Sequence, residues 1–154
     1  MKFHKIEVAR KQPDTAIALF FADGDPCSII TLAAASEEVL GQYDDGTWVA
    51  DNPNNMFNRM FEAAKAHGLG FDSKKEFSQR LVNVTKNSLK QAHRADEQFI
   101  CVNQEEAVFR LLRAILNCQV ASREPYTDSM NRLETWLRTN RPEYIGAASG
   151  GTAT

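Results

Sequence analysis

The sequence predicts an all-α fold, a single-domain bundle of about five to six helices. Apolar residues recur three and four residues apart in successive segments, which is the spacing of one helix face. Most of these segments begin at a helix-capping residue and end near glycine or proline. The pattern contains no alternation of strands with helices, no repeat and no sustained heptad. A length of 154 residues suits one domain, which we expect at residues 1–146, followed by a disordered tail of small and polar residues at 147–154.

The N-terminal residues are expected to form a short helix and then the first core helix. Pro13 lacks a backbone donor and clashes with the preceding turn, so it predicts a break or a kink after residues 3–10. In the segment that follows, Ile17 and Phe20 share one face, and Gly24 is suited to end the helix.

Residues 26–40 are expected to form the second core helix. Asp25 is a preferred N-cap and Pro26 a preferred first residue of a helix. We interpret Glu37 and Glu38 as an exposed carboxylate pair, of which one could approach a neighbouring helix. The stripe expected to be buried consists of Ile29, Leu32, Ala33, Ser36, Val39 and Leu40.

The middle of the chain is expected to contain a loop and two further helices. Residues 44–55 collect turn formers, so we predict no strand there and place Trp48 over the edge of the core. Residues 56–68 return to the helical spacing. The longest helix is expected at residues 73–94, where a capping box begins with Ser73.

Two more helices are predicted near the C-terminus. Asn103 is the expected cap of a deeply apolar helix over residues 103–118. Thr127 is the expected cap of a last helix over residues 128–137, which should end before Pro142.

Composition narrows the classes of function. The formal net charge of -2 and a pI near 5.9 give no overall attraction for nucleic acid. The three cysteines form no C-x-x-C pair and lie in apolar segments, as in proteins of a reducing compartment. The charged N-terminus is unlike a signal peptide, and no run has the length of a membrane span. We therefore expect a cytoplasmic protein without membrane contact, metal or cofactor.

The segment "KNSLKQAHR" at residues 86–94 carries the densest set of chemistry-bearing side chains. Helical spacing places these side chains on one side of the predicted helix. One interpretation is a solvated face whose cations lie near the helix C-terminus, where the macrodipole favours them. The other is a surface that faces a ligand. As binding candidates we take Lys86, Asn87, Lys90, His93 and Arg94.

Two blocks resemble those of a family of small, uncharacterised bacterial helical proteins. They are "KQPDTAIALFFADGDPCSIITLAAASEEVLG" at residues 11–41 and "KNSLKQAHRAD" at residues 86–96. The likeness continues through "NQEEAVFRLLRAILNC" and "WLRTNRPEYI" and covers most of the chain. It implies an all-helical fold and no assigned activity. The sequence departs from the family pattern at Pro13, Gln91 and Ala95.

A wider resemblance connects the second block to HEPN domains, helical bundles whose late helix carries R-N-x(3 to 5)-H and which often cut RNA as dimers without metal. That resemblance implies that Lys86 and Asn87 engage the scissile phosphate and that His93 assists proton transfer at the ribose 2'-hydroxyl. Gln91 stands where the histidine is expected and cannot exchange a proton near neutral pH, and lysine lacks the fork of arginine. Catalytic candidates are thus Lys86, Asn87 and His93, without a committed catalytic set.

We expect a helical interaction or regulatory module that self-associates and has no catalytic activity. The alternative is a HEPN-type, metal-independent ribonuclease or an RNA- or nucleotide-binding protein. A homodimer is expected because the first two core helices carry many apolar residues for one bundle to cover, and because HEPN-like proteins dimerise. A protein partner is compatible with the same reasoning.

Overall fold

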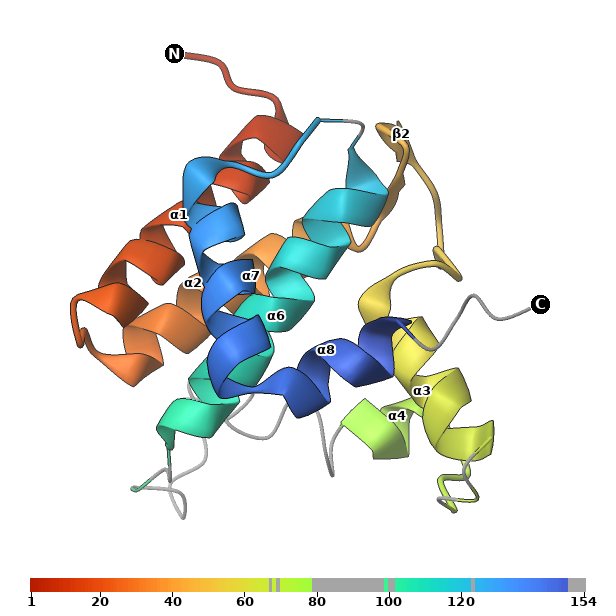
Figure 1. Cartoon of the computed structure of the whole chain (residues 1–154). Coiled ribbons are helices and arrows are strands. Elements are labelled where there is room, and N and C mark those ends of the chain that lie inside the picture. Colours follow the sequence, from red (N-terminus) through yellow and green to blue (C-terminus); the bar gives the residue numbers. More distant parts are fainter. Residues whose placement is uncertain (67, 69, 79–98, 100–101, 123, 150–154) are drawn as a thin grey trace.

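The computed structural model describes residues 1–66, 68, 70–78, 99, 102–122 and 124–149 (Figure 1). These residues form seven helices and one two-stranded antiparallel sheet, which confirms the all-α class. The elements are α1 (Lys5–Phe21), α2 (Pro26–Leu40), β1 (Tyr43–Asp44), β2 (Thr47–Trp48), α3 (Met56–Ala66), α4 (Lys74–Phe77), α6 (Gln104–Ala121), α7 (Asp128–Asn140) and α8 (Pro142–Ser149).

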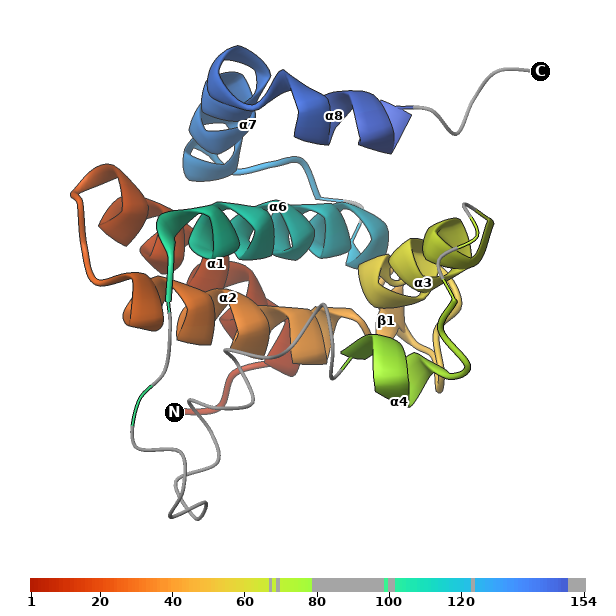
Figure 2. The ribbon, with the colours of Figure 1, turned by 90° about the horizontal axis from the view of Figure 1, so that it is seen from below.

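Helix α6 lies at the centre of the bundle. Figure 2 shows it between α7 on one side and the pair α1 and α2 on the other. Its buried residues point in almost every direction around its axis, as expected for a central helix. The core joins these four helices, with Ile17, Ile30, Leu111, Ile115 and Leu133 among its most buried side chains. None of the described helices is long and apolar enough to cross a membrane.

Helix α1 continues through Pro13, so the alternative of a separate short helix before this proline is wrong. A proline at this position deprives the carbonyl of Ala9, four residues earlier, of its helical donor. The hydroxyl of Ser36 on α2 supplies the missing hydrogen bond, donating to that carbonyl at 2.8 Å. Ala9 and Ser36 are both buried, and a neighbouring helix therefore satisfies the acceptor that Pro13 leaves open.

The turn between α1 and α2 agrees with the prediction that this helix ends near Gly24. The amide of Gly24 donates to the carbonyl of Leu19 at 2.8 Å, and the positive φ of 51° falls on Asp23. A Cβ at Gly24 would lie only 2.9 Å from the Leu19 oxygen, so close approach requires glycine here. The next helix starts as predicted, with Asp25 accepting from the amides of Cys27 and Ser28 and with Pro26 in the first position.

Residues 43–48 form a β-hairpin, which contradicts the prediction of a loop without strands. Asp45 and Gly46 have φ values of 50° and 77°, as a two-residue hairpin turn of the primed type requires. The Asp-Gly pair is typical of a hairpin turn, but the many turn formers around it favoured the prediction of a loop. The turn amides donate to the carbonyls of Val120 and Ala121, so the hairpin caps the C-terminus of α6. Trp48 is 61% exposed and does not cover the core as expected.

Helices α3 and α4 share a smaller apolar cluster that is separate from the main core. Phe77 contacts Phe57, Phe61 and Phe71, with ring centroids 5.2 to 5.6 Å apart. The predicted helix at residues 56–68 is confirmed as α3. Ser73 caps α4 by accepting from the amide of Glu76, while the remainder of the helix predicted at residues 73–94 lies outside the described residues after Ser78.

The C-terminal helices begin at the predicted caps and contain one element that was not predicted. Asn103 accepts from the amide of Glu106 at the start of α6, and Thr127 accepts from that of Met130 at the start of α7. Pro142 was expected to follow the last helix but instead opens α8, because proline suits the first turn of a helix. The backbone of α8 runs to Ser149, three residues into the segment expected to be a disordered tail.

The contact between Ser36 and Ala9 can be tested by a double-mutant cycle. Ser36→Ala should lower the free energy of unfolding by about 1–3 kcal/mol, the usual effect of leaving a buried carbonyl unsatisfied. In a Pro13→Ala background the cost should fall by about 1 kcal/mol, because alanine restores the backbone donor.

Urea unfolding of the four proteins measures this coupling. Thr31→Ala is the matched control, because its hydroxyl is exposed and bonds within α2. This control should change the free energy of unfolding by no more than about 0.5 kcal/mol. Equal costs of Ser36→Ala with and without Pro13 would contradict the proposed compensation.

Candidate functional sites

The binding candidates named from the sequence all lie outside the described residues. This applies to Lys86, Asn87, Lys90, His93 and Arg94, and therefore also to the three catalytic candidates among them. Their predicted roles stay predictions. Two other places, both along α6 in the described part of the chain, combine polar side chains with a cavity.

The first place is a buried ionic cluster between α2 and α6. A single oxygen, Oε2 of Glu37, lies 2.7 Å from Nη2 of Arg113 and 3.6 Å from Nη1 of Arg110. All three side chains are at least nine-tenths buried, with exposures of 7%, 4% and 2% respectively. The interpretation of both glutamates as exposed is therefore wrong for Glu37, which approaches the neighbouring helix α6 as the alternative allowed, whereas Glu38 is exposed as expected. Burial of Glu37 is possible because cations of the facing helix offset its desolvation.

Arg113 is held in this cluster by only part of its guanidinium. Its Nη2 meets Glu37, while Nε and Nη1 are buried without a hydrogen-bond partner. Burial lowers the pKa of Arg113 to about 10, against the opposing effect of the Glu37 charge. The side chain consequently remains a cation near neutral pH.

A cavity of about 220 Å³ adjoins this arginine. Its lining combines charged, amide and aromatic side chains of α2, α3 and α6 and of the segments that follow α2. They belong to Glu37, Glu38, Gln42, Asn55, Phe57, Arg113 and Asn117, together with Gly41.

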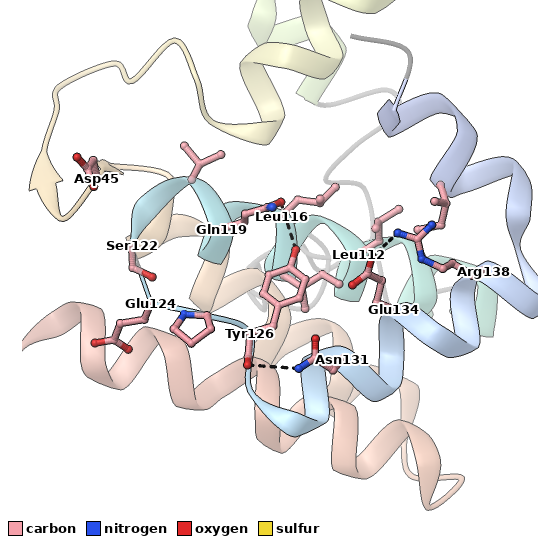
Figure 3. Close-up of a pocket in the computed structure, with 14 residues that line it drawn as sticks. Asp45, Leu112, Leu116, Gln119, Ser122, Glu124, Tyr126, Asn131, Glu134 and Arg138 are labelled. Atoms are coloured by element: carbon pink, nitrogen blue, oxygen red, sulfur yellow. Dashed lines mark hydrogen bonds and ion pairs between the residues drawn. The ribbon is translucent and has the colours of Figure 1, made fainter. Parts of the chain in front are cut away.

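The second place is a groove of about 740 Å³ along α6, α7 and α8, shown in Figure 3. Leu112, Ile115 and Leu116 of α6 and Ile145 of α8 provide its apolar lining. Asp45 of the β-hairpin lies at one end. The groove thus combines apolar side chains of α6 and α8 with the exposed turn of the hairpin.

Polar side chains of the groove are largely engaged with one another. The Tyr126 ring lies in the middle of the view of Figure 3, with its hydroxyl 3.5 Å from Oε1 of Gln119. Burial, and then the charge of Glu134, raise the pKa of the Tyr126 hydroxyl, so it stays protonated. On α7, Arg138 forms an ion pair with Glu134. These groups can orient a ligand by hydrogen bonds but are not arranged to exchange protons with it.

The Ser122 hydroxyl in the groove and the buried Cys118 thiol are not activated as nucleophiles. Arg10 donates to the Ser122 hydroxyl, which in turn donates to the carbonyl of Cys118 at 3.2 Å. Burial raises the pKa of the Cys118 thiol to about 12, which keeps it protonated. Among the described residues no group of three or more histidine, cysteine or carboxylate side chains could hold a metal.

The sequence contains a signal for the ionic cluster. Arg110 and Arg113 stand three residues apart inside the otherwise apolar run "VFRLLRAIL", so they share one face of a helix that is buried on several sides. Two arginines on such a face require a buried counter-charge. The spacing does not say which carboxylate supplies it, because that depends on how α2 packs.

Comparison of the chain with models of protein families, with curated proteins and with solved structures gave no match.

Removing the charge of Glu37 tests the ionic cluster. We expect Glu37→Gln to lower the free energy of unfolding by about 3 kcal/mol or more, because two buried guanidinium groups lose a shared counter-charge. Glu38→Gln on the same helix is the control and should change it by no more than about 0.5 kcal/mol. Chemical denaturation at neutral pH measures both, and a loss below about 1 kcal/mol for Glu37→Gln would show that the cluster is effectively hydrated.

Proposed function

We propose that this chain is a helical interaction module that self-associates and has no catalytic activity of its own. The observation that carries the proposal is the position of the groove beside the exposed Trp48. Asp45, which lines the groove, and Trp48 belong to the same hairpin. The hairpin thus connects a groove that has apolar residues in its lining with an exposed aromatic side chain.

This adjacency suits a symmetric pair. In a two-fold dimer both copies use the same surface patch. A residue of this patch that lies close to the symmetry axis therefore contacts, on the second copy, the surface beside its own counterpart. The hairpin of one copy would then place Trp48 in the groove of the second copy, and the reverse contact would follow by symmetry. Burial of tryptophan removes a large apolar area from water, and its indole N–H requires an acceptor, which Gln119 or Glu124 in the groove can offer.

The earlier reason for expecting a homodimer does not support the proposal. The apolar residues of α1 and α2 lie mainly in the core of the chain itself, including Ile17, Phe20, Ile29 and Ile30. Phe3, Val8 and Trp48 remain as exposed large apolar side chains near the N-terminus and hairpin. The proposed contact therefore depends on the hairpin and the groove, and not on unpaired faces of the first two helices.

Replacing Trp48 tests the dimer. Sedimentation velocity at about 10–100 µM, a range that covers weak protein–protein affinities, should show a dimer for the unmodified protein. Trp48→Ser should weaken dimerisation by at least about 30-fold, which corresponds to the 2 kcal/mol of an interface hot spot. Leu116→Glu should have the same effect from the groove side, because a charge would enter the apolar lining.

Phe3→Ser is the matched control for the loss of an exposed aromatic side chain. Phe3 is 57% exposed and does not line the groove, so the variant should dimerise like the unmodified protein. A monomer in the unmodified protein would overturn the proposal. A dimer that neither Trp48→Ser nor Leu116→Glu weakens would overturn the assignment of the contact.

The ribonuclease alternative is tested by RNA cleavage. We expect no cleavage of single-stranded RNA in the presence of a metal chelator, because Gln91 cannot transfer the proton and Lys86 lacks the bidentate fork for phosphate. Gel analysis of labelled RNA measures this directly. Metal-independent cleavage that falls by about two orders of magnitude in His93→Ala, with an unchanged melting temperature, would favour the HEPN mechanism and contradict the absence of catalysis.

A further inference from the structure

We propose that the cavity beside Arg113 is a binding site for a small anion that carries a carboxylate or a phosphate group. This inference concerns a different face of α6 from the groove and does not depend on self-association. The side chain of Arg113 is only 4% exposed, and it lines the cavity. Its Nε and Nη1 have no hydrogen-bond partner.

Unpartnered guanidinium donors are the first argument. A buried N–H without an acceptor costs about 1–3 kcal/mol, and more when the group is charged. Arginine has five N–H donors and no acceptor, so only an acceptor atom can satisfy the groups that Glu37 does not reach. An anion in the adjoining cavity would provide such atoms and would form charge-assisted hydrogen bonds, which are about twice as strong as neutral ones.

The amide side chains on the wall of the cavity are a second, independent argument. The Oδ1 atom of Asn117 already accepts from the amide of Met56 at 3.1 Å, and that of Asn55 accepts from the amide of Asn58 at 2.7 Å. Each asparagine therefore has its NH₂ group, a donor, left for other contacts. Two amides whose oxygens are occupied by helix α3 add donors to a cavity that already holds an arginine.

Charge and size define the ligand. One carboxylate oxygen of Glu37 serves both Arg113 and Arg110, so Arg113 shares its counter-charge. Two carboxylates also line the cavity. Arg110 and Arg113 offset the charge of the buried Glu37, whereas Glu38 is exposed, so water and salt screen its charge far more than that of a buried group. The volume of about 220 Å³ is below the range of pockets for drug-sized ligands, about 300–1,000 Å³, which selects a small anion over a nucleotide.

Binding of inorganic phosphate and of acetate, each replacing chloride at constant ionic strength, tests the site and separates its two possible chemistries. Thermal unfolding should shift to higher temperature with one of the two ions, because a ligand of the native state stabilises it. In two-dimensional NMR of the unmodified protein, the side-chain Nε–H signal of Arg113 should move with saturation as that ion is added. Preference for phosphate or for acetate identifies the ligand class.

The decisive variant is Arg113→Lys, which keeps a cation opposite Glu37 but removes the guanidinium donors. It should weaken binding by at least about tenfold, or 1.4 kcal/mol. Arg59→Lys, the same change at an exposed arginine that lines neither the cavity nor the groove, is the control and should bind like the unmodified protein.

Two results would overturn the proposal. One is the absence of any saturable shift of the Arg113 signal with either ion in the unmodified protein, a measurement that does not depend on whether the variant folds. The other is equal binding by a folded Arg113→Lys protein, which would place the bound ion elsewhere on the surface.

Discussion

The burial of Glu37 against Arg110 and Arg113 is the constraint on which the arrangement of the bundle depends. Charges can leave water only where opposite charges and hydrogen bonds meet them with good geometry. The short Glu37–Arg113 contact therefore restricts how α2 can slide or rotate against α6. Helix α1 packs against both α2 and α6, so this register also affects where α1 lies and, through α1, where α7 lies.

A related requirement, that every buried backbone group finds a partner, links the elements around this centre. Ser36 satisfies the carbonyl that Pro13 leaves open, and the hairpin turn supplies amides to the end of α6. Asn117 of α6 in turn accepts from the backbone at the start of α3. In each case a backbone group that lacks a partner in its own element forms a hydrogen bond with an atom of another element. These bonds restrict how the neighbouring elements can pack.

Both proposed binding surfaces arise from different faces of α6. Leu112 and Leu116 line the groove, whereas Arg113 and Asn117, each one residue further along, line the small cavity. Since successive residues of a helix turn by about 100°, one helix can present an apolar stripe and a polar stripe to separate surfaces. The groove therefore suits an apolar side chain of a second copy, and the cavity suits an anion.

The sequence by itself determined the helical class and most helix starts, because caps such as Asp25, Asn103 and Thr127 act on amides only two or three residues away. It also contains the Asp45–Gly46 pair, which is typical of a hairpin turn, and two arginines, Arg110 and Arg113, whose spacing indicates a buried counter-charge. Only the tertiary structure decided that α1 passes through Pro13, that Glu37 is buried and that Arg113 borders a cavity. The physical reason is that these features depend on atoms far apart in the chain. A missing donor, a counter-charge or an empty volume is supplied by another helix, and periodicity along one helix carries no information about which residue of a neighbour will face it.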